Sequence, residues 1–196
     1  MLKIKLLTGL LTLSLLGTIN AQEQNSEKSV YLKVNAPFLP IGILNAGLEH
    51  QISKKYTVQA DVFISPWKSF AGRHAQVYMG HLEGRYYFQE AFKHWYLGVN
   101  GGFGVFDLTK WNYSGTEKFQ RGFSLMLGAT VGYQFQWKER WNIDIFAGGG
   151  TSQGFYHGYE NVPPDSFVRY EGAEGWNKSG ETIPYRGGIM ISYKLK

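Results

Sequence analysis

The chain of 196 residues contains no cysteine, which excludes a disulfide framework and a lipid-anchored N-terminal cysteine. Only 18% of the residues are charged and no block of Lys or Arg stands out, so nucleic acid is not an expected partner. Beyond residue 22 no stretch of 18 residues is apolar throughout, so no transmembrane helix is expected there. The five histidines include no His-x-x-x-His pair, and no Asp-rich calcium loop is present. Neither a metal nor another cofactor is therefore expected.

Glycine and aromatic residues are abundant instead. The chain has 25 Gly, 13 Phe, 13 Tyr and 6 Trp. Disordered chains are poor in aromatics. Helical bundles avoid this much glycine, since each interior Gly costs about 1 kcal/mol relative to Ala. The composition therefore predicts a single all-β domain.

The first 21 residues differ from the rest of the chain. Lys3 and Lys5 precede an apolar stretch at 6–16, and Ala21 is followed by a polar run. This pattern predicts a secretory signal peptide at 1–21, a short tail at 22–28 and a domain at 29–196. The alternative is a membrane anchor, but the stretch is far shorter than the about 20 residues that a span needs. Removing the two lysines leaves 18 basic and 15 acidic residues, a net charge of +3 instead of +5.

Apolar and polar residues alternate with a period of two along most of the domain, which is typical of strands. The segment 122–135 is the clearest, with Phe123, Leu125 and Leu127 on one face and Ser124 and Gly128 on the other. Eight strands are expected, at 29–36, 44–52, 56–65, 75–88, 95–107, 122–135, 141–151 and 184–195.

The connections between these segments alternate in length. Short polar turns lie at 53–55, 89–93 and 138–140, whereas long links lie at 37–43, 66–74, 108–121 and 152–183. Short turns on one side and long loops on the other are typical of outer-membrane barrels, whose tilted strands cross with about ten residues. The sequence therefore predicts an eight-stranded antiparallel up-and-down transmembrane β-barrel, with outer-membrane lipids around it.

Charged residues share strand faces with Gly and Ser, opposite the apolar faces. Because lipid surrounds such a barrel, the charged face is expected inside. Buried charges are costly unless paired, so we expect a closed, ion-paired interior. The residues expected in this network are Glu49, Asp61, Glu83, Arg85, Asp144 and Arg186, and Lys194 has the same parity. Aromatics near strand ends, among them Trp95, Trp141 and Tyr185, are expected in two belts facing the headgroups.

The long links carry exposed aromatic candidates that could bind an extracellular ligand or protein. They are Trp111, Tyr113, Tyr156, Tyr159 and Trp176. The alternative is that these segments extend the strands and that their rings pack at the rim. Both interpretations stay open at this point.

Catalysis is a weaker hypothesis. Some barrels of this size are lipid A deacylases, and that type resembles a His-x-Ser pair on one strand together with an acid. None of the five histidines here is followed by Ser two positions later. His81 and Glu83 share an inward face and form the best local pair, but a polar interior network is the preferred explanation for them. A non-enzymatic protein with a structural or recognition role is the leading expectation. A lipid-modifying enzyme and a narrow channel or small-molecule transporter are the alternatives.

Several segments resemble a known family. They are 48–49 together with 53–56, 65–67, 82–88, 132–137 and 140–144. They are similar to an uncharacterised family, a domain of unknown function, of small Gram-negative outer-membrane barrels, and more broadly to the outer-membrane protein A/X-type barrel. The final alternating segment, 186–193, resembles the signal read by the barrel assembly machinery. The resemblance implies an outer-membrane location and this fold, and it implies no activity and no functional residues.

Overall fold

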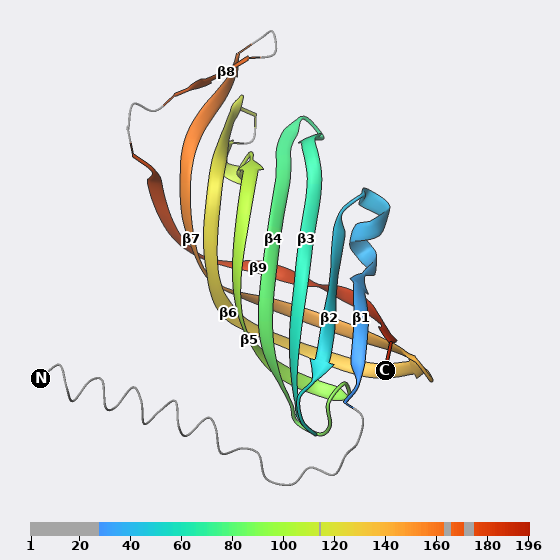
Figure 1. Ribbon diagram of the computed structural model, residues 1–196. Helices are drawn as coiled ribbons and strands as arrows, with labels where there is room; N and C mark the ends of the chain where they lie inside the picture. Colours follow the sequence, from blue (N-terminus) through green and yellow to red (C-terminus); the bar gives the residue numbers. More distant parts are fainter. Residues whose placement is uncertain (1–27, 114, 163–165, 171–174) are drawn as a thin grey trace, which may run out of the picture.

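The computed structural model describes residues 28–113, 115–162, 166–170 and 175–196. They form an all-β antiparallel sheet that closes in a ring (Figure 1). This confirms the expected all-β class and antiparallel pairing. The strands are β1 (Val30–Asn35), β2 (Leu44–Gln51), β3 (Tyr56–Phe70), β4 (Arg73–Tyr87), β5 (His94–Leu108), β6 (Lys118–Lys138), β7 (Trp141–Val162), β8 (Ser166–Arg169) and β9 (Asn177–Lys194). Two short 3-10 helices, η1 (Ala36–Ile41) and η2 (Trp111–Tyr113), lie in connections.

Eight of the nine strands make the ring. From β1 to β7 each strand pairs with the next, β7 also pairs with β9, and β9 pairs with β1 to close the circle. The short strand β8 pairs only with the end of β7, beyond the part of β7 that β9 covers. Because eight antiparallel strands form the ring, β1 begins and β9 ends on the same side.

The expected long loop at 152–183 is wrong over much of its length. Strand β7 continues to Val162, and β9 begins at Asn177. The ladder between β6 and β7 extends to the pair Lys118–Glu160, and Phe155 is paired with Lys178. Polar residues and glycines interrupt the apolar alternation in this segment. Backbone pairing between strands does not depend on that alternation, so the strands continue where the pattern stops.

The expected long link at 66–74 is also wrong. Strands β3 and β4 form a tight hairpin in which Phe70 pairs with Arg73. The two residues between them, Ala71 and Gly72, have φ values of 51° and 76°. Positive φ at both positions is the requirement of the type I′ turn that suits the twist of two-residue hairpins. The loop end of the ring is therefore uneven, with one tight turn among longer connections.

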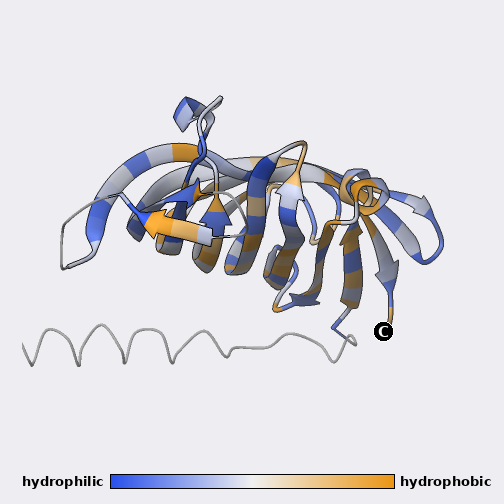
Figure 2. Cartoon of the chain, turned by 90° about the horizontal axis from the view of Figure 1, so that it is seen from above, coloured by the Kyte–Doolittle hydropathy of each residue, from blue (hydrophilic) through white to orange (hydrophobic). Residues whose placement is uncertain are grey.

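The two faces of the wall have opposite character, and the strands in Figure 2 are banded in hydrophilic and hydrophobic colours. On the outer face, Val99 and Leu127 are 67% and 60% exposed. On the inner face, Lys33, Glu49 and Gln134 are completely buried. This arrangement reverses the ordinary rule in which charged side chains face the surroundings and apolar ones are buried.

The turn between β4 and β5 covers the short-turn end of the ring. It was expected to be a simple polar turn, but Ala91 and Phe92 are buried. The ring of Phe92 lies 4.4 Å from that of Tyr31 and 6.1 Å from that of Tyr87. Phe92 has a φ of 68°, a conformation that costs about 1–2 kcal/mol in a non-glycine residue. Its burial stabilises this turn, and its ring fills the end of the interior.

The expected signal peptide, 1–21, and the tail as far as residue 27 lie outside the described residues. Within the described ranges, neither helix has the length and apolar character that a membrane crossing requires.

Candidate functional site

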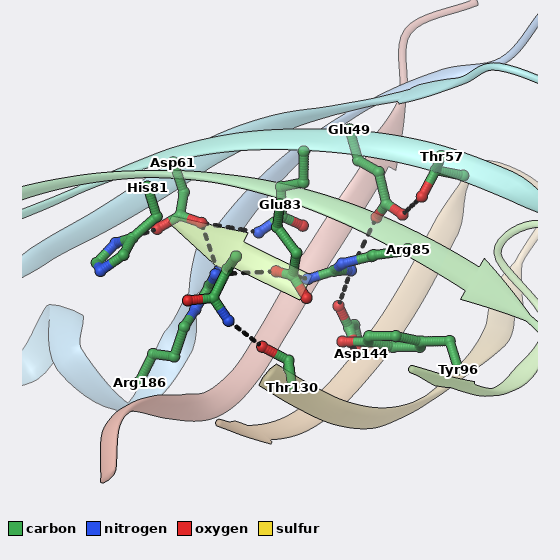
Figure 3. Close-up of polar contacts among 12 residues, drawn as sticks. Glu49, Thr57, Asp61, His81, Glu83, Arg85, Tyr96, Thr130, Asp144 and Arg186 are labelled. Carbon is green, nitrogen blue, oxygen red and sulfur yellow. Dashed lines mark hydrogen bonds and ion pairs between the residues drawn. The ribbon is translucent and has the colours of Figure 1, made fainter. Parts of the chain in front are cut away.

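The interior is built around buried charges on four different strands. The ammonium group of Lys33 on β1 lies 2.6 Å from a carboxylate oxygen of Glu49 on β2 and 2.5 Å from one of Asp144 on β7. Arg85 on β4 donates from Nη1 to the same two oxygens at 3.1 and 2.9 Å (Figure 3). All four side chains are fully buried. Two cations therefore share two carboxylates, so each buried charge has partners of opposite sign.

A second group of charges continues from the first toward the loop end. Nη2 of Arg85 lies 3.2 Å from Glu83, which also lies 3.0 Å from Nη1 of Arg186 on β9. Arg186 in turn donates from Nη2 to Asp61 on β3 at 2.6 Å. Figure 3 shows this chain of contacts running through the interior. The charges thus form one connected network across the ring.

Neutral side chains complete the hydrogen bonding of the carboxylates. Thr57 donates to Glu49 at 2.6 Å, and the hydroxyl of Tyr96 donates to Asp144 at 2.9 Å. The Tyr96 ring also lies under the guanidinium of Arg85, 4.4 Å away. A Cβ atom at Gly132 would overlap the Tyr96 ring, so the glycine provides the room this ring needs.

The structure brings together all six residues that were expected in an interior network. They are Glu49, Asp61, Glu83, Arg85, Asp144 and Arg186. Sequence reasoning missed Lys33, although it alternates with Leu32 and Val34 and so had a readable signal. Lys194, which shares the inward parity, lies partly exposed at the short-turn end.

The expected pairing of His81 with Glu83 is not what the structure shows. Glu83 is held between the two arginines, whereas Nδ1 of His81 lies 3.4 Å from Asp61. The imidazole ring stacks on Tyr185 with 5.8 Å between centroids. His81 therefore belongs to the end of the charge network, and the local His–Glu pair proposed for catalysis does not form.

Tyr185 was expected on the outer face, in an aromatic belt, and this expectation is wrong. The pairing of β7 with β9 shifts register between Gly148 and Gly149, where Gly148 pairs with Arg186 and Gly149 with Pro184. Such a bulge turns the extra residue to the other face. Tyr185 consequently points inward and donates a 2.6 Å hydrogen bond to Asn100.

A cavity of about 240 Å³ lies beside the loop-end part of the network. Its lining combines aromatic and other apolar side chains with a few polar ones. The residues around it are Phe38, Asn45, Asp61, Phe63, Met79, His81, Phe146, Pro184, Tyr185, Arg186 and Gly187. This cavity gives the interior room for a small ligand.

Four of the five aromatic residues proposed for loop contacts pack against neighbours. The hydroxyl of Tyr113 lies 3.1 Å from the hydroxyl of Tyr170, and the ring of Tyr159 stacks on that of Phe119. Trp176 stacks on His157 with 4.2 Å between centroids. Tyr156 faces Lys110, whose ammonium lies 5.7 Å from the ring. The fifth, Trp111, is 86% exposed. Binding through these residues stays a prediction, and the packing supports the alternative of a rim built by strand extension.

Within the described ranges, no group of three or more His, Asp or Glu side chains is arranged to hold a metal ion.

At the short-turn end, Arg140 donates a 3.3 Å hydrogen bond to Tyr193, and this bond raises the pKa of Arg140.

Comparison with known proteins gives one match. The sequence model of a family described as proteins of unknown function (DUF3575) matches residues 9–182, which is most of the chain. No curated protein and no solved structure matches it. The family match spans nearly the whole ring, including every residue of the charge network except Arg186. The chain belongs to this family of proteins of unknown function.

Proposed function

We propose that this protein is an integral outer-membrane β-barrel without enzymatic activity, with a filled interior and a structural or surface-recognition role. The observation that carries the proposal is the reversal of the two faces. Charges are buried inside, and large apolar side chains such as Leu82, Val99 and Leu127 are exposed outside. Lipid is the surrounding in which such an outer face is favourable.

The geometry of the wall supports the same proposal. A closed ring pairs the backbone groups that lipid would otherwise leave unsatisfied. Strands β3, β4 and β5 have 15 residues each, more than the about ten that a tilted strand needs to cross. Exposed aromatics occur at the short-turn end, including Tyr56, Trp95 and Trp137. Such rings are favoured in the headgroup zone.

The filled interior supports a structural or recognition role over transport. The network joins side chains from β1, β2, β3, β4, β7 and β9, and Phe92 covers the short-turn end. A channel would need these contacts to separate. The loop end, with Trp111 exposed, is then the surface on which partner recognition would occur.

Cell fractionation and gel migration test this proposal. The full chain, expressed in a Gram-negative host, is expected in the outer-membrane fraction, since its exposed apolar wall needs lipid. Without boiling it should migrate faster on a gel than after boiling, because a closed ring resists detergent. Recovery in the soluble fraction with identical mobility before and after boiling would contradict the proposal.

A further inference from the structure

The cavity beside the network lies at an interruption of the ring wall. The described residues 178–186 of β9 pair with β7 on one side and have no strand on the other, because β1 pairs only with Met190–Lys194. On the far side of this interruption, β2 begins only at Leu44, which pairs with Ile64, while β3 continues to Phe70. The helix η1 contacts both β9 and β2 here, and Phe38 from this helix lines the cavity. Among the described residues, the cavity thus borders the part of the wall where a helix, rather than a paired strand, lies beside β9.

The lower edge of this interruption is sealed by Asn35. Its side-chain amide donates to the carbonyl of Gly187 at 3.1 Å, and its oxygen accepts from the amide of Ile189 at 3.1 Å. At the upper edge, the indole of Trp67 donates to the carbonyl of Ile41 at the end of η1. The helix is therefore attached at both of its ends.

Two polar side chains at the cavity have nitrogen atoms without a hydrogen-bond partner among the described residues. They are both ring nitrogens of His81 and Nε of Arg186. Their side chains are only 2% and 5% exposed. The other two guanidinium nitrogens of Arg186 lie 3.0 Å from Glu83 and 2.6 Å from Asp61, and Nδ1 of His81 lies 3.4 Å from Asp61 without completing a hydrogen bond. Buried donors of this kind are normally satisfied, so their presence beside an open space indicates a missing acceptor.

The other walls of the cavity favour an apolar body. Phe38 and Phe63 meet edge to face with 5.4 Å between centroids, and Phe146 and Met79 lie on the remaining sides. Ligand pockets with a mostly apolar lining and a few convergent polar groups have volumes of about 300–1,000 Å³. At about 240 Å³, this cavity is suited to a ligand smaller than those.

We infer that this cavity binds a small monocarboxylate with an aromatic or short aliphatic body, its carboxylate accepting from Arg186 and His81. Arginine is suited to carboxylates because its planar group offers several fixed donors. The interior already holds four buried carboxylates and three buried cations, so binding of a further carboxylate depends on its direct contact with Arg186. His81 lies 3.4 Å from Asp61 and stacks on Tyr185, which places its ring beside Arg186 in the cavity wall.

Three probes with the same ring and different head groups test the inference on the full chain in detergent. They are phenylacetate, 2-phenylethanol and 2-phenylethylamine, titrated by calorimetry. Phenylacetate should bind most tightly, and Arg186→Lys should weaken it by about tenfold or more while changing 2-phenylethanol little. The lysine keeps the charge beside Asp61 and Glu83 but removes Nε. Tightest binding of the amine, no binding of any probe, or an unchanged affinity in the variant would overturn the inference.

Cysteine chemistry locates the binding without changing the network. Since the chain has no cysteine, Met79→Cys places a single thiol in the cavity wall and Thr151→Cys places one on the outer face. Phenylacetate should slow modification of Cys at position 79 by methyl methanethiosulfonate by about tenfold, and it should leave position 151 unchanged. Equal rates at position 79 with and without phenylacetate would show that the probe binds elsewhere.

Discussion

At the scale of single residues, Arg85 is the link between the two halves of the interior network. Its guanidinium contacts Glu49, Glu83 and Asp144, all fully buried. Charges in such a place need partners, since removing one partner of a buried pair costs about 3–5 kcal/mol. The ion pairs need not stabilise the protein more than an apolar core would. The strand positions already bury the carboxylates, so losing a cation leaves a buried charge without a partner.

Replacing Arg85 tests this dependence. Arg85→Met should lower the free energy of unfolding by about 3–5 kcal/mol, because three buried carboxylates lose a cation. Urea unfolding from lipid vesicles, followed by tryptophan fluorescence, measures it. The control is Lys93→Met, which removes an exposed ion pair with Glu90 and should cost at most about 1 kcal/mol. Equal losses for the two variants would contradict an interior held by paired charges.

Leu127 tests what surrounds the outer face. It lies near the middle of β6 and is 60% exposed. Leu127→Lys should cost about 2–4 kcal/mol if lipid covers this position. If water covered it, the same change would be within about 0.5 kcal/mol of neutral. Gln89→Lys, in the exposed turn after β4, is the matched control and should be neutral in either case.

At the scale of elements, the β3–β4 hairpin carries strain that the sequence does not minimise. Ala71 occupies a left-handed position that glycine or asparagine adopts more readily. Ala71→Gly should therefore stabilise the protein by roughly 1 kcal/mol, and Gly72→Ala should destabilise it by a similar amount. Open space around Gly72 means that no clash would confuse the comparison. Unfolding midpoints that move in the same direction for both variants would refute the turn assignment.

The elements also show how far the sequence could be interpreted. Alternation located the wall segments of β5 and β6 because their outward residues are mostly apolar. It failed on the upper part of β7, where Thr151, Gln153 and His157 occupy outward positions, and at the loop end of β3. Backbone pairing with an adjacent strand extends such strands. The local sequence of one strand does not show which segment pairs with it.

The candidate site divides in the same way. Glu83, Arg85 and Asp144 could be assigned to the interior because parity along a regular strand fixes the face. Tyr185 could not, because the bulge at Gly148 and Gly149 reverses parity at one point. The roles of Phe92 and η1 also depend on where connections fold back in space. Those positions come from tertiary contacts and leave no periodic pattern in the sequence.

At the scale of the whole molecule, the filled interior makes a prediction about conduction. The network and Phe92 leave a side cavity of about 240 Å³, so purified protein in planar bilayers should show no large, steady open channel. Arg85→Met, which weakens the network, should raise the frequency of brief openings, whereas Lys93→Met should not. A stable, wide conductance in the unaltered protein would show that the interior opens as a pore.

The closing pair of strands also sets an order of assembly. Tyr31 on β1 pairs with Lys194 on β9, so the seam joins positions about 160 residues apart, whereas every other ring contact is a hairpin between successive ring strands. Each doubling of a loop adds only about 0.6 kcal/mol of entropic cost, but distant partners meet slowly. We therefore expect the seam to be the last contact to form. Until it does, β1 and β9 are two open edges that can pair with other chains, and the polypeptide is most vulnerable to aggregation during that interval.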